Sequence, residues 1–237
     1  MINNLLNLKG FLNSPAGIAV FCVAAAALLI LILDLNYRLF AKRLLDFIAS
    51  LITVCVISPL LIVCAVISKV RSENGSVLDY ADYIGLNGKV ISVSGFAGIS
   101  GPLKNLSCIL DVLCGKLSMV GPKLVESGDA ALIEDGAMER FSVRPGLVSP
   151  LAVSGGEQLT YEEMFAADVR YIKRREMFMD FGILICAAVK GIRGDGKKYL
   201  GEAAEKSYAQ TLLQRGAITE EDVITARNYA AEASKKN

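Results

Sequence analysis

Two long uncharged stretches dominate the hydrophobic pattern of the first third of the chain. The first, Ala16 to Leu33, has 18 residues, and a helix of that length rises about 27 Å. This nearly spans the hydrocarbon core of a bilayer, which is about 30 Å thick. The pattern predicts a retained transmembrane anchor. A cleaved signal peptide is the alternative, although only Lys9 precedes the stretch as a charge and no Ala-x-Ala site follows it.

The second stretch, Phe47 to Ile67, is interrupted by Ser58 and Pro59. Proline removes one helical hydrogen bond and clashes with the preceding turn, so the helix is expected to bend or break there. Basic residues flank the stretch on both sides: Lys42, Arg43, Lys69 and Arg71. Lys and Arg beside membrane segments prefer the cytoplasm. The pattern therefore favours a re-entrant helix over residues 44–68 that enters and leaves by one face. A second transmembrane helix with a proline kink is the alternative.

From Ser72 onward the pattern is that of a small α/β domain. Two strand-like segments surround Asn87-Gly88, a pair typical of the turn in a β-hairpin because both positions need positive φ. Helices are predicted over Pro102 to Leu113, over Leu159 to Tyr171 with Thr160 as N-cap, and over Phe178 to Val189. The last of these is apolar enough to pack on the core or to rest on a bilayer surface.

After Gly196 the composition shifts towards Ala, Glu and Lys, and two amphipathic helices are predicted around Gly216. They form either a docking arm for a partner or a helical hairpin that closes the domain. The predicted fold class is a helix-rich α/β membrane-associated domain. It divides into an anchor (1–37), a central domain (38–196) and a helical C-terminal extension (197–237).

The amino-acid composition limits the kinds of protein and of catalytic or metal site that are possible. The 53% hydrophobic content and the mean hydropathy of +0.46 indicate a membrane protein. Lys and Arg (25) nearly balance Asp and Glu (24), which disfavours a nucleic-acid partner. No histidine is present, so Ser-His-Asp and Cys-His pairs and histidine metal sites are excluded. The six cysteines lack metal-ligand spacing, and we expect reduced thiols and no metal site.

Five strings occur in order: KRLLDFIASLITVCVISP, GLNGK, DVLCGKLSMVGPK, RFSVRPGLVSPLAVSG and LTYEEMFAADVRYIKRREMFMDFGILI. Together they resemble the bacterial sugar transferase family, the monotopic polyprenyl-phosphate phosphoglycosyltransferases, over residues 38 to 195. Each string alone is moderately specific. Six residues fall on the family's membrane motif: Lys42, Arg43, Asp46, Ser50, Ser58 and Pro59.

The resemblance implies an enzyme on the cytosolic face of the bacterial inner membrane. Family members transfer a sugar 1-phosphate from a nucleotide diphosphate sugar to undecaprenyl phosphate, with Mg²⁺, and so begin an exopolysaccharide or another glycan. The implied partners are this lipid and the sugar nucleotide, with an active homologue or a second copy of the chain as further expectations. If the chain is inactive, no cofactor is expected.

The family nucleophile is an Asp-Glu pair, and counting back from DVLCG places Lys104 and Asn105 at these two positions. Asparagine cannot form an acyl phosphate, and a lysine with a pKa near 10.4 is largely protonated. About two dozen family residues before this pair, including several arginines, are absent. Lys123 replaces the arginine of a Gly-Pro-Arg-Pro string, whereas Arg144 is retained; both are candidates for phosphate binding. Three carboxylates are available as substitutes: Asp79, Asp82 and Asp111.

These observations favour a family member with an impaired active site that acts as a partner or regulatory homologue. One alternative is an active transferase with rearranged catalytic groups. The other is a membrane sensor that binds nucleotide or phosphate through Lys104, Lys123 and Arg144.

Overall fold

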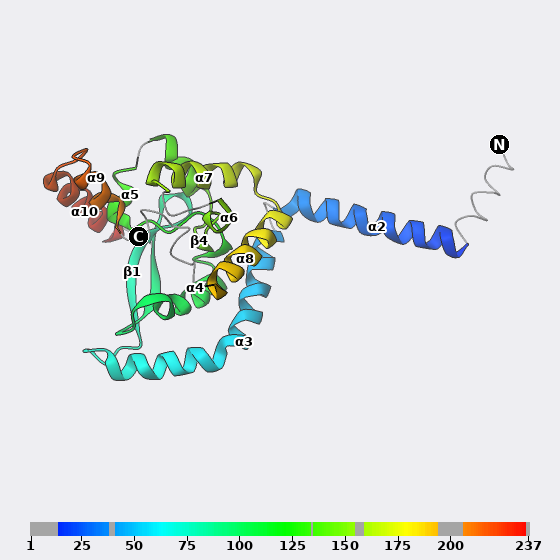
Figure 1. The fold of residues 1–237 in the computed structure, drawn as a ribbon, viewed down its shortest axis with the longest axis horizontal. Helices are drawn as coiled ribbons and strands as arrows, with labels where there is room; N and C mark the ends of the chain where they lie inside the picture. Colours follow the sequence, from blue (N-terminus) through cyan, green and yellow to red (C-terminus); the bar gives the residue numbers. More distant parts are fainter. Residues whose placement is uncertain (1–13, 38–40, 134, 155–158, 194–205, 236–237) are drawn as a thin grey trace. The chain divides into compact units, whose positions relative to one another are not determined.

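The computed structural model describes residues 14–37, 41–133, 135–154, 159–193 and 206–235 (Figure 1). The chain divides into two units, Met1–Lys42 and Arg43–Asn237. The first unit contains α2 (Pro15–Asn36), an uninterrupted helix whose large side chains, such as Phe21 and Val23, are exposed. Both α2 and α3 (Lys42–Arg71) are long and apolar enough to cross a membrane.

The helix α3 continues through Pro59 and bends along its length, as Figure 1 shows. Pro59 has no N–H to donate to the carbonyl of Cys55, four residues earlier. The hydroxyl of Ser58 donates to that carbonyl instead, at 2.9 Å. The helix is therefore bent, as the sequence predicts, but it does not end at Pro59, where a side chain satisfies the carbonyl.

The predicted hairpin is confirmed. The strand β1 (Leu78–Ile84) pairs antiparallel with β2 (Val90–Phe96), with Leu78 opposite Phe96. The connection contains the short helix η2 (Leu86–Gly88), in which Asn87 and Gly88 have φ of 56° and 74°. A second, parallel pair of strands, β3 (Ser118–Val120) and β4 (Gly146–Val148), was not predicted. Strands of three residues are too short to show an alternating pattern.

The predicted helices are present with shifted ends. The segment from Pro102 begins as the 3₁₀ helix η3 (Gly101–Ser107) and continues as the α-helix α4 (Cys108–Cys114). The 3₁₀ pattern extends to their junction, where Cys108 N–H donates to the carbonyl of Asn105, three residues earlier. The helix α7 (Tyr161–Arg174) has the predicted Thr160 N-cap, completed by Glu163. The remaining elements are α5 (Ser127–Ala130), η4 (Asp135–Ser142), α6 (Leu151–Ser154), α8 (Met177–Ile192), α9 (Tyr208–Gln214) and α10 (Glu220–Lys235).

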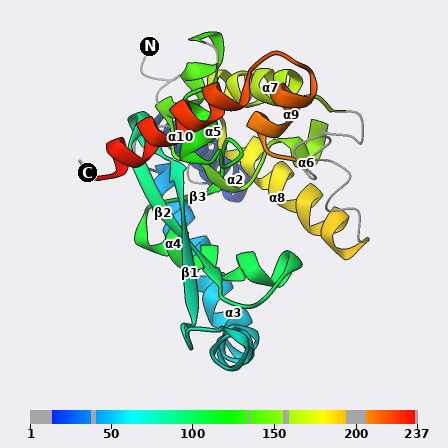
Figure 2. The ribbon, with the colours of Figure 1, turned by 90° about the vertical axis from the view of Figure 1, so that its left-hand side faces the viewer.

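The main core gathers buried side chains from β2, α4, β3, α7 and α8: Val93, Ile109, Val112, Leu117, Val120, Tyr171 and Ile183. A second cluster joins α7 to α9 through Tyr161, Phe165 and Tyr208. The hairpin runs between α3 at one end and α5 and α10 at the other (Figure 2). The opposite face of α8 exposes apolar side chains: Phe178, Phe181, Ile185 and Ile192.

The C-terminal helices pack on the domain. Tyr208 N–H donates to the Asp129 carboxylate at 2.7 Å, and α10 lies against α5. The turn between α9 and α10 has Gly216 at φ 68°, and Thr219 caps α10 through Asp222, as the sequence indicates. Residues 194–205, with the start of the first predicted helix, lie outside the described residues. The arrangement is that of a helical hairpin packed on the domain.

Candidate active site

The N-terminal end of α3 is bonded to α4. The Arg43 guanidinium donates to the carbonyls of Val112 and Leu113 at 2.9 and 3.1 Å. Both carbonyls lie at the end of α4, where that of Val112 also accepts the Gly115 N–H at 3.0 Å. Gly115 follows in the left-handed conformation, and a Cβ at this position would lie 2.6 Å from Arg43 Nη2. The glycine is required both by its φ and by the approach of Arg43.

The other residues of the membrane motif have structural contacts. Asp46 is buried and accepts hydrogen bonds from Ser118 Oγ and from Met119 N–H. Ser50 is fully buried, with its hydroxyl on the Phe47 carbonyl. Lys42 places its ammonium 5.8 Å from the centre of the Tyr37 ring.

The C-terminal end of α3 is bonded to the hairpin. The buried Ser68 hydroxyl contacts the carbonyls of Val77 and Ala97 at 2.6 and 2.7 Å. Cys64 packs with Phe96 and Ile99 in the third apolar cluster. Both ends of α3 are therefore bonded to the same structural unit, although the helix is long enough to cross a membrane.

Lys104 and Asn105 lie in η3, and both are exposed. The stem of Lys104 lies along β2, where a Cβ on Gly95 would be 3.1 Å from Lys104 Cε. The structure therefore puts this ammonium beside the hairpin. The assignment of positions 104 and 105 to the family's catalytic pair stays a prediction.

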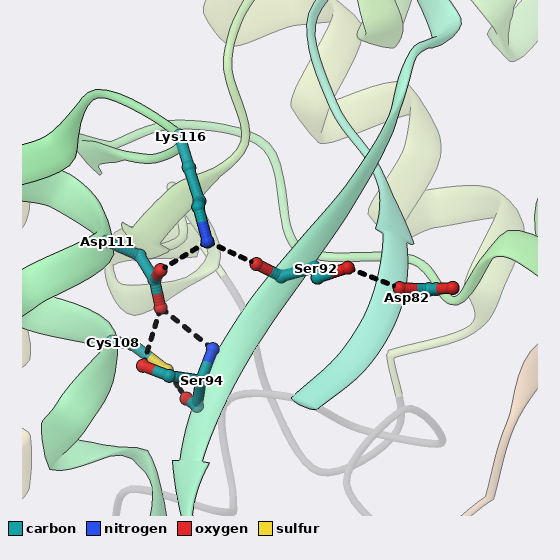
Figure 3. Close-up of polar contacts among 6 residues, drawn as sticks. All are labelled: Asp82, Ser92, Ser94, Cys108, Asp111 and Lys116. Atoms are coloured by element: carbon teal, nitrogen blue, oxygen red, sulfur yellow. Dashed lines mark hydrogen bonds and ion pairs between the residues drawn. The ribbon is translucent and has the colours of Figure 1, made fainter. Parts of the chain in front are cut away.

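Asp111 connects α4 to β2 (Figure 3). Its buried carboxylate accepts hydrogen bonds from the Ser94 N–H and hydroxyl at 2.8 and 2.7 Å, and it forms an ion pair with Lys116 at 3.2 Å. Lys116 also donates to the Ser92 carbonyl. Both carboxylate oxygens of Asp111 contact protein donors, which suits a structural role better than attack on a substrate.

The same cluster contains Asp82 and Cys108 (Figure 3). Asp82 lies on β1 and accepts a hydrogen bond from Ser92 Oγ at 2.7 Å. Cys108 points its thiol at the Ser94 carbonyl, and burial raises the pKa of this thiol to about 11. A thiol with that pKa is protonated near neutral pH and is a poor nucleophile. Asp79, the third candidate carboxylate, is exposed on β1.

The strings that contain Lys123 and Arg144 lie side by side. Gly121 N–H donates to the Val148 carbonyl, and Gly146 N–H donates to the Pro122 carbonyl. A Cβ on Gly146 would lie 2.0 Å from Gly121 N, so no larger residue fits there. The two phosphate-binding candidates are thus brought onto neighbouring segments, whereas Lys104 lies on η3.

A buried ion pair that the sequence analysis missed supports these segments. Arg140 and Asp168 are 1% and 0% exposed, with 2.7 Å between Nη2 and Oδ2. The same Nη2 donates to the Lys123 carbonyl at 2.6 Å, and the guanidinium lies 4.5 Å from the centre of the Phe165 ring. Within the described residues Arg140 Nε and Nη1 and Asp168 Oδ1 are buried without a hydrogen-bond partner.

The sequence contains a signal for one of these two residues. Asp168 occupies the same face of the helix as Tyr161, Met164 and Tyr171, which are buried. A charge at that spacing on an apolar face indicates a buried partner of opposite charge. The identity of the partner is set by tertiary packing.

The electrostatics change the view of Lys123. Its ammonium lies 5.9 Å from the centre of the Tyr161 ring. Burial, with the Arg140 charge beside it, lowers the pKa of Lys123 to about 8. Burial also raises the pKa of the Asp168 carboxyl, and the Arg140 guanidinium opposes this shift. Lys123 is therefore a less complete cation near pH 8 than a surface lysine.

The described residues do not offer a set of ligands for Mg²⁺. No group of three or more Asp, Glu or Cys side chains gathers in them closely enough to hold a metal ion. Magnesium usually needs one or two carboxylates together with substrate phosphates. All six cysteines are free thiols.

The sequence was compared with families of known proteins, and part of the chain matches one of them. The sequence profile described as "Bacterial sugar transferase" matches residues 99–194, from the start of η3 to the end of α8. The matched segment includes positions 104, 105, 123 and 144 and both partners of the buried ion pair.

Curated relatives agree. The chain is 29% identical over 94 residues to an uncharacterized sugar transferase, EpsL, of Bacillus subtilis, over 40% of this chain and 46% of EpsL. It is 29% identical over 82 residues to the exopolysaccharide production protein ExoY of Rhizobium meliloti, over 35% and 36%. It is 27% identical over 185 residues to a UDP-glucose:undecaprenyl-phosphate glucose-1-phosphate transferase of Klebsiella pneumoniae, over 63% and 40%. The chain thus spans less than half the length of each of these relatives. With the profile match, these similarities support the assignment of residues 99–194 to the bacterial sugar transferase family.

Proposed function

We propose that the chain is a membrane-seated member of this family that acts in surface polysaccharide or glycoconjugate synthesis on undecaprenyl phosphate, with its own transfer reaction impaired. In this proposal it works as a partner or regulator of an active homologue. The observation that carries the proposal is that the family's nucleophile position has no carboxylate and that two candidate substitutes are already bonded to protein groups. Position 105 is Asn, and Asp111 and Asp82 are engaged by Ser94, Lys116 and Ser92.

The chemistry explains why this matters. A covalent phosphosugar intermediate requires an oxygen nucleophile that can approach phosphorus. Phosphoryl transfer otherwise depends on positioning and on cations around the transferring group. Asp168 lies beside the cations Arg140 and Lys123 but is 0% exposed, so a substrate has no access to it. Asp168 therefore has the neighbouring cations but not the access that a nucleophile needs.

The re-entrant seating of α3 is part of the proposal. Arg43 at one end of α3 bonds to α4, and Ser68 near the other end bonds to the hairpin. If α3 spanned the bilayer, these two attachments would lie on opposite sides of the membrane. One folded unit satisfies both attachments when α3 enters and leaves by the same face. The basic residues at both ends favour the cytosolic face of the inner membrane.

Turnover is the direct test. The full chain in membranes is incubated with radiolabelled UDP-glucose, undecaprenyl phosphate and Mg²⁺, and lipid-linked product is measured. We expect none, and no phosphosugar adduct in the intact mass. Product that disappears in Asp111→Asn or Asp82→Asn but persists in the matched surface variant Asp222→Asn would overturn the proposal in favour of a rearranged active transferase.

The partner role has its own test. The full chain is purified from membranes that contain an active family member, and the amount of that enzyme and its rate of product formation are compared with and without the chain. We expect co-purification and a changed rate. An unchanged rate together with no association would contradict the partner role.

Cysteine labelling tests the seating of α3. Cys114 is exposed beside the Arg43 contact, and Asn74→Cys adds an exposed thiol after the C-terminal end of α3. A membrane-impermeant maleimide should label neither thiol in intact spheroplasts and both after permeabilisation, with Cys114→Ser separating the two signals. Labelling of Asn74→Cys alone in intact spheroplasts would mean that α3 spans the membrane.

A further inference from the structure

A groove of about 740 Å³ lies between α7, η4 and the C-terminal helices. Its apolar floor includes Phe165, Tyr208 and Leu212. The volume is in the range of small-molecule sites and far exceeds that of an inorganic ion. Since α9 lies outside the family match, one wall belongs to the family domain and the other to the extension.

The floor is built as a fixed platform. The rings of Phe165 and Tyr208 lie 5.1 Å apart, edge to face, and Tyr161 packs against both at 5.8 and 5.1 Å. The Arg140 guanidinium lies 4.5 Å from the centre of the Phe165 ring and is itself fully buried. Tyr208 N–H is bonded to Asp129, which fixes the start of α9. A rigid aromatic floor lowers the entropic cost of binding a planar apolar group.

The rim is cationic. Three basic side chains, Arg170, Lys173 and Arg215, line the groove with a single carboxylate, Glu162. Glu139, which pairs with Lys173, is a second carboxylate there, so three basic and two acidic side chains leave a formal excess of one positive charge at the rim. Two exposed ion pairs occupy part of it: Arg215 with Glu162 at 2.6 Å, and Lys173 with Glu139 at 3.2 Å.

These pairs leave the rim able to bind an anion. Exposed ion pairs are worth roughly 0–1 kcal/mol, so exchange of one for a ligand contact costs little. Arg170 makes no ion pair or side-chain hydrogen bond within the described part of the chain. A planar fork of donors suits the oxygens of a phosphate. The rim has an excess of one positive charge, which attracts a phosphate monoester because that group is an anion near neutral pH.

We propose that this groove binds an aromatic phosphate monoester, with its ring on the Phe165–Tyr208 floor and its phosphate at Arg170. The proposed site is separate from positions 104 and 105 and does not depend on whether the chain transfers sugar phosphate. A ligand there contacts both α7 and α9, so its binding would stabilise the C-terminal helices on the family domain.

Calorimetric titration of the full chain in phosphatidylcholine nanodiscs tests the site. The probe is 1-naphthyl phosphate, with inorganic phosphate and 1-naphthol as the two half-probes. We expect saturable binding of the complete probe that is at least about tenfold tighter than that of either half, because ring and phosphate contacts add in one site. Absence of saturable binding of 1-naphthyl phosphate would overturn the proposal.

Two variants locate the binding. Ala166 is exposed on α7 and lines the groove, so Ala166→Trp should fill the groove and abolish binding. Arg170→Ala should weaken it roughly tenfold or more. The matched control is Ala231→Trp on the exposed face of α10, which should leave binding unchanged. Circular dichroism checks that each variant is folded.

The opposite results are equally clear. Binding that survives in folded Ala166→Trp would place the probe elsewhere and refute the site. Loss of binding in Lys104→Ala with retention in Ala166→Trp would assign the phosphate to the family's reaction region instead. Hydrogen exchange provides a second measurement: the probe should slow exchange in α9 of the wild type and not in Ala166→Trp.

Discussion

Asp46, one turn into α3, accepts a 2.6 Å hydrogen bond from the hydroxyl of Ser118, which lies 72 residues later in β3. The same carboxylate accepts the Met119 N–H at 3.2 Å. A residue near the start of an apolar helix thus satisfies two donors of a short buried strand. Family motif residues here hold α3 on the domain.

The first prediction concerns this contact. Asp46→Ala leaves the buried Met119 N–H without its acceptor, which costs about 1–3 kcal/mol, and leaves Ser118 Oγ with only the Val120 carbonyl at 2.9 Å. We expect a lower midpoint of thermal unfolding, followed by circular dichroism because the chain has no tryptophan. Asp46→Asn keeps one acceptor oxygen and should lose less. An Asp46→Ala midpoint equal to that of the wild type would contradict the assigned role.

The buried pair Arg140–Asp168 gives a second prediction. Removal of one partner leaves an uncompensated buried charge, so Arg140→Met or Asp168→Leu alone should destabilise the fold by about 3–5 kcal/mol. The double variant removes both charges and should be less destabilised than the sum of the single variants. Denaturant unfolding of all four proteins gives the coupling energy; additive losses would mean that the pair is not a unit.

The third prediction is a pH dependence. The pKa of Lys123 is lowered to about 8 from 10.5 in the unfolded chain, chiefly by burial. The folded state therefore binds fewer protons than the unfolded state between pH 8 and 10.5, so this group's contribution to stability rises with pH across that window. It is lost as the pH falls through about 8.

Amine acylation measured by mass spectrometry checks this titration. Lys123 should react with a midpoint near pH 8, below the pKa of about 10.4 of a lysine side chain in a model peptide. The unfolding free energy should rise between pH 8 and 10.5 in the wild type and less in Lys123→Met. A Lys123 midpoint near pH 10.4 would contradict the burial argument.

The fourth prediction tests the close approach of two glycines. A Cβ at position 146 would lie 2.0 Å from Gly121 N and 2.7 Å from the Val148 carbonyl oxygen. Gly146 and Val148 are held by strand pairing, and Gly121 N–H donates to the Val148 carbonyl at 3.1 Å. Gly146→Ala should therefore separate β3 from β4 and lower the unfolding midpoint by several degrees. Gly136→Ala is the control, since no atom lies within 4 Å of its Cβ position. Equal midpoints would argue against the packing at this crossing.

Local chemistry made much of the fold predictable. Asn87 and Gly88 adopt the positive φ that their residue types favour, and Thr160 caps α7 with Glu163 three residues on. Pro59 bends α3 because a proline has no N–H wherever it lies. The parallel pair β3–β4 and the Arg140–Asp168 ion pair could not be predicted, because each joins residues far apart in the chain through packing alone.

The candidate site, like the fold, was predictable only in part from the sequence. Motif spacing places Lys123 and Arg144 on neighbouring segments, and the contact of Gly121 with Gly146 explains why both strings contain glycine. Spacing could not reveal that Asp111 is occupied by Ser94 and Lys116, because these partners come from a different strand and from the turn after α4. The groove beside α7 depends on where the extension packs, which no local pattern specifies.

The attachment of both ends of α3 has a mechanical consequence. Arg43 and Ser68 fix the distance between the two points where the helix meets its domain, so the depth of the bend is set by the length of two short arms. If α3 is re-entrant, as we propose, such a bent helix would reach a constant depth whatever the thickness of the lipid. Thicker or thinner membranes would have to adapt to the protein.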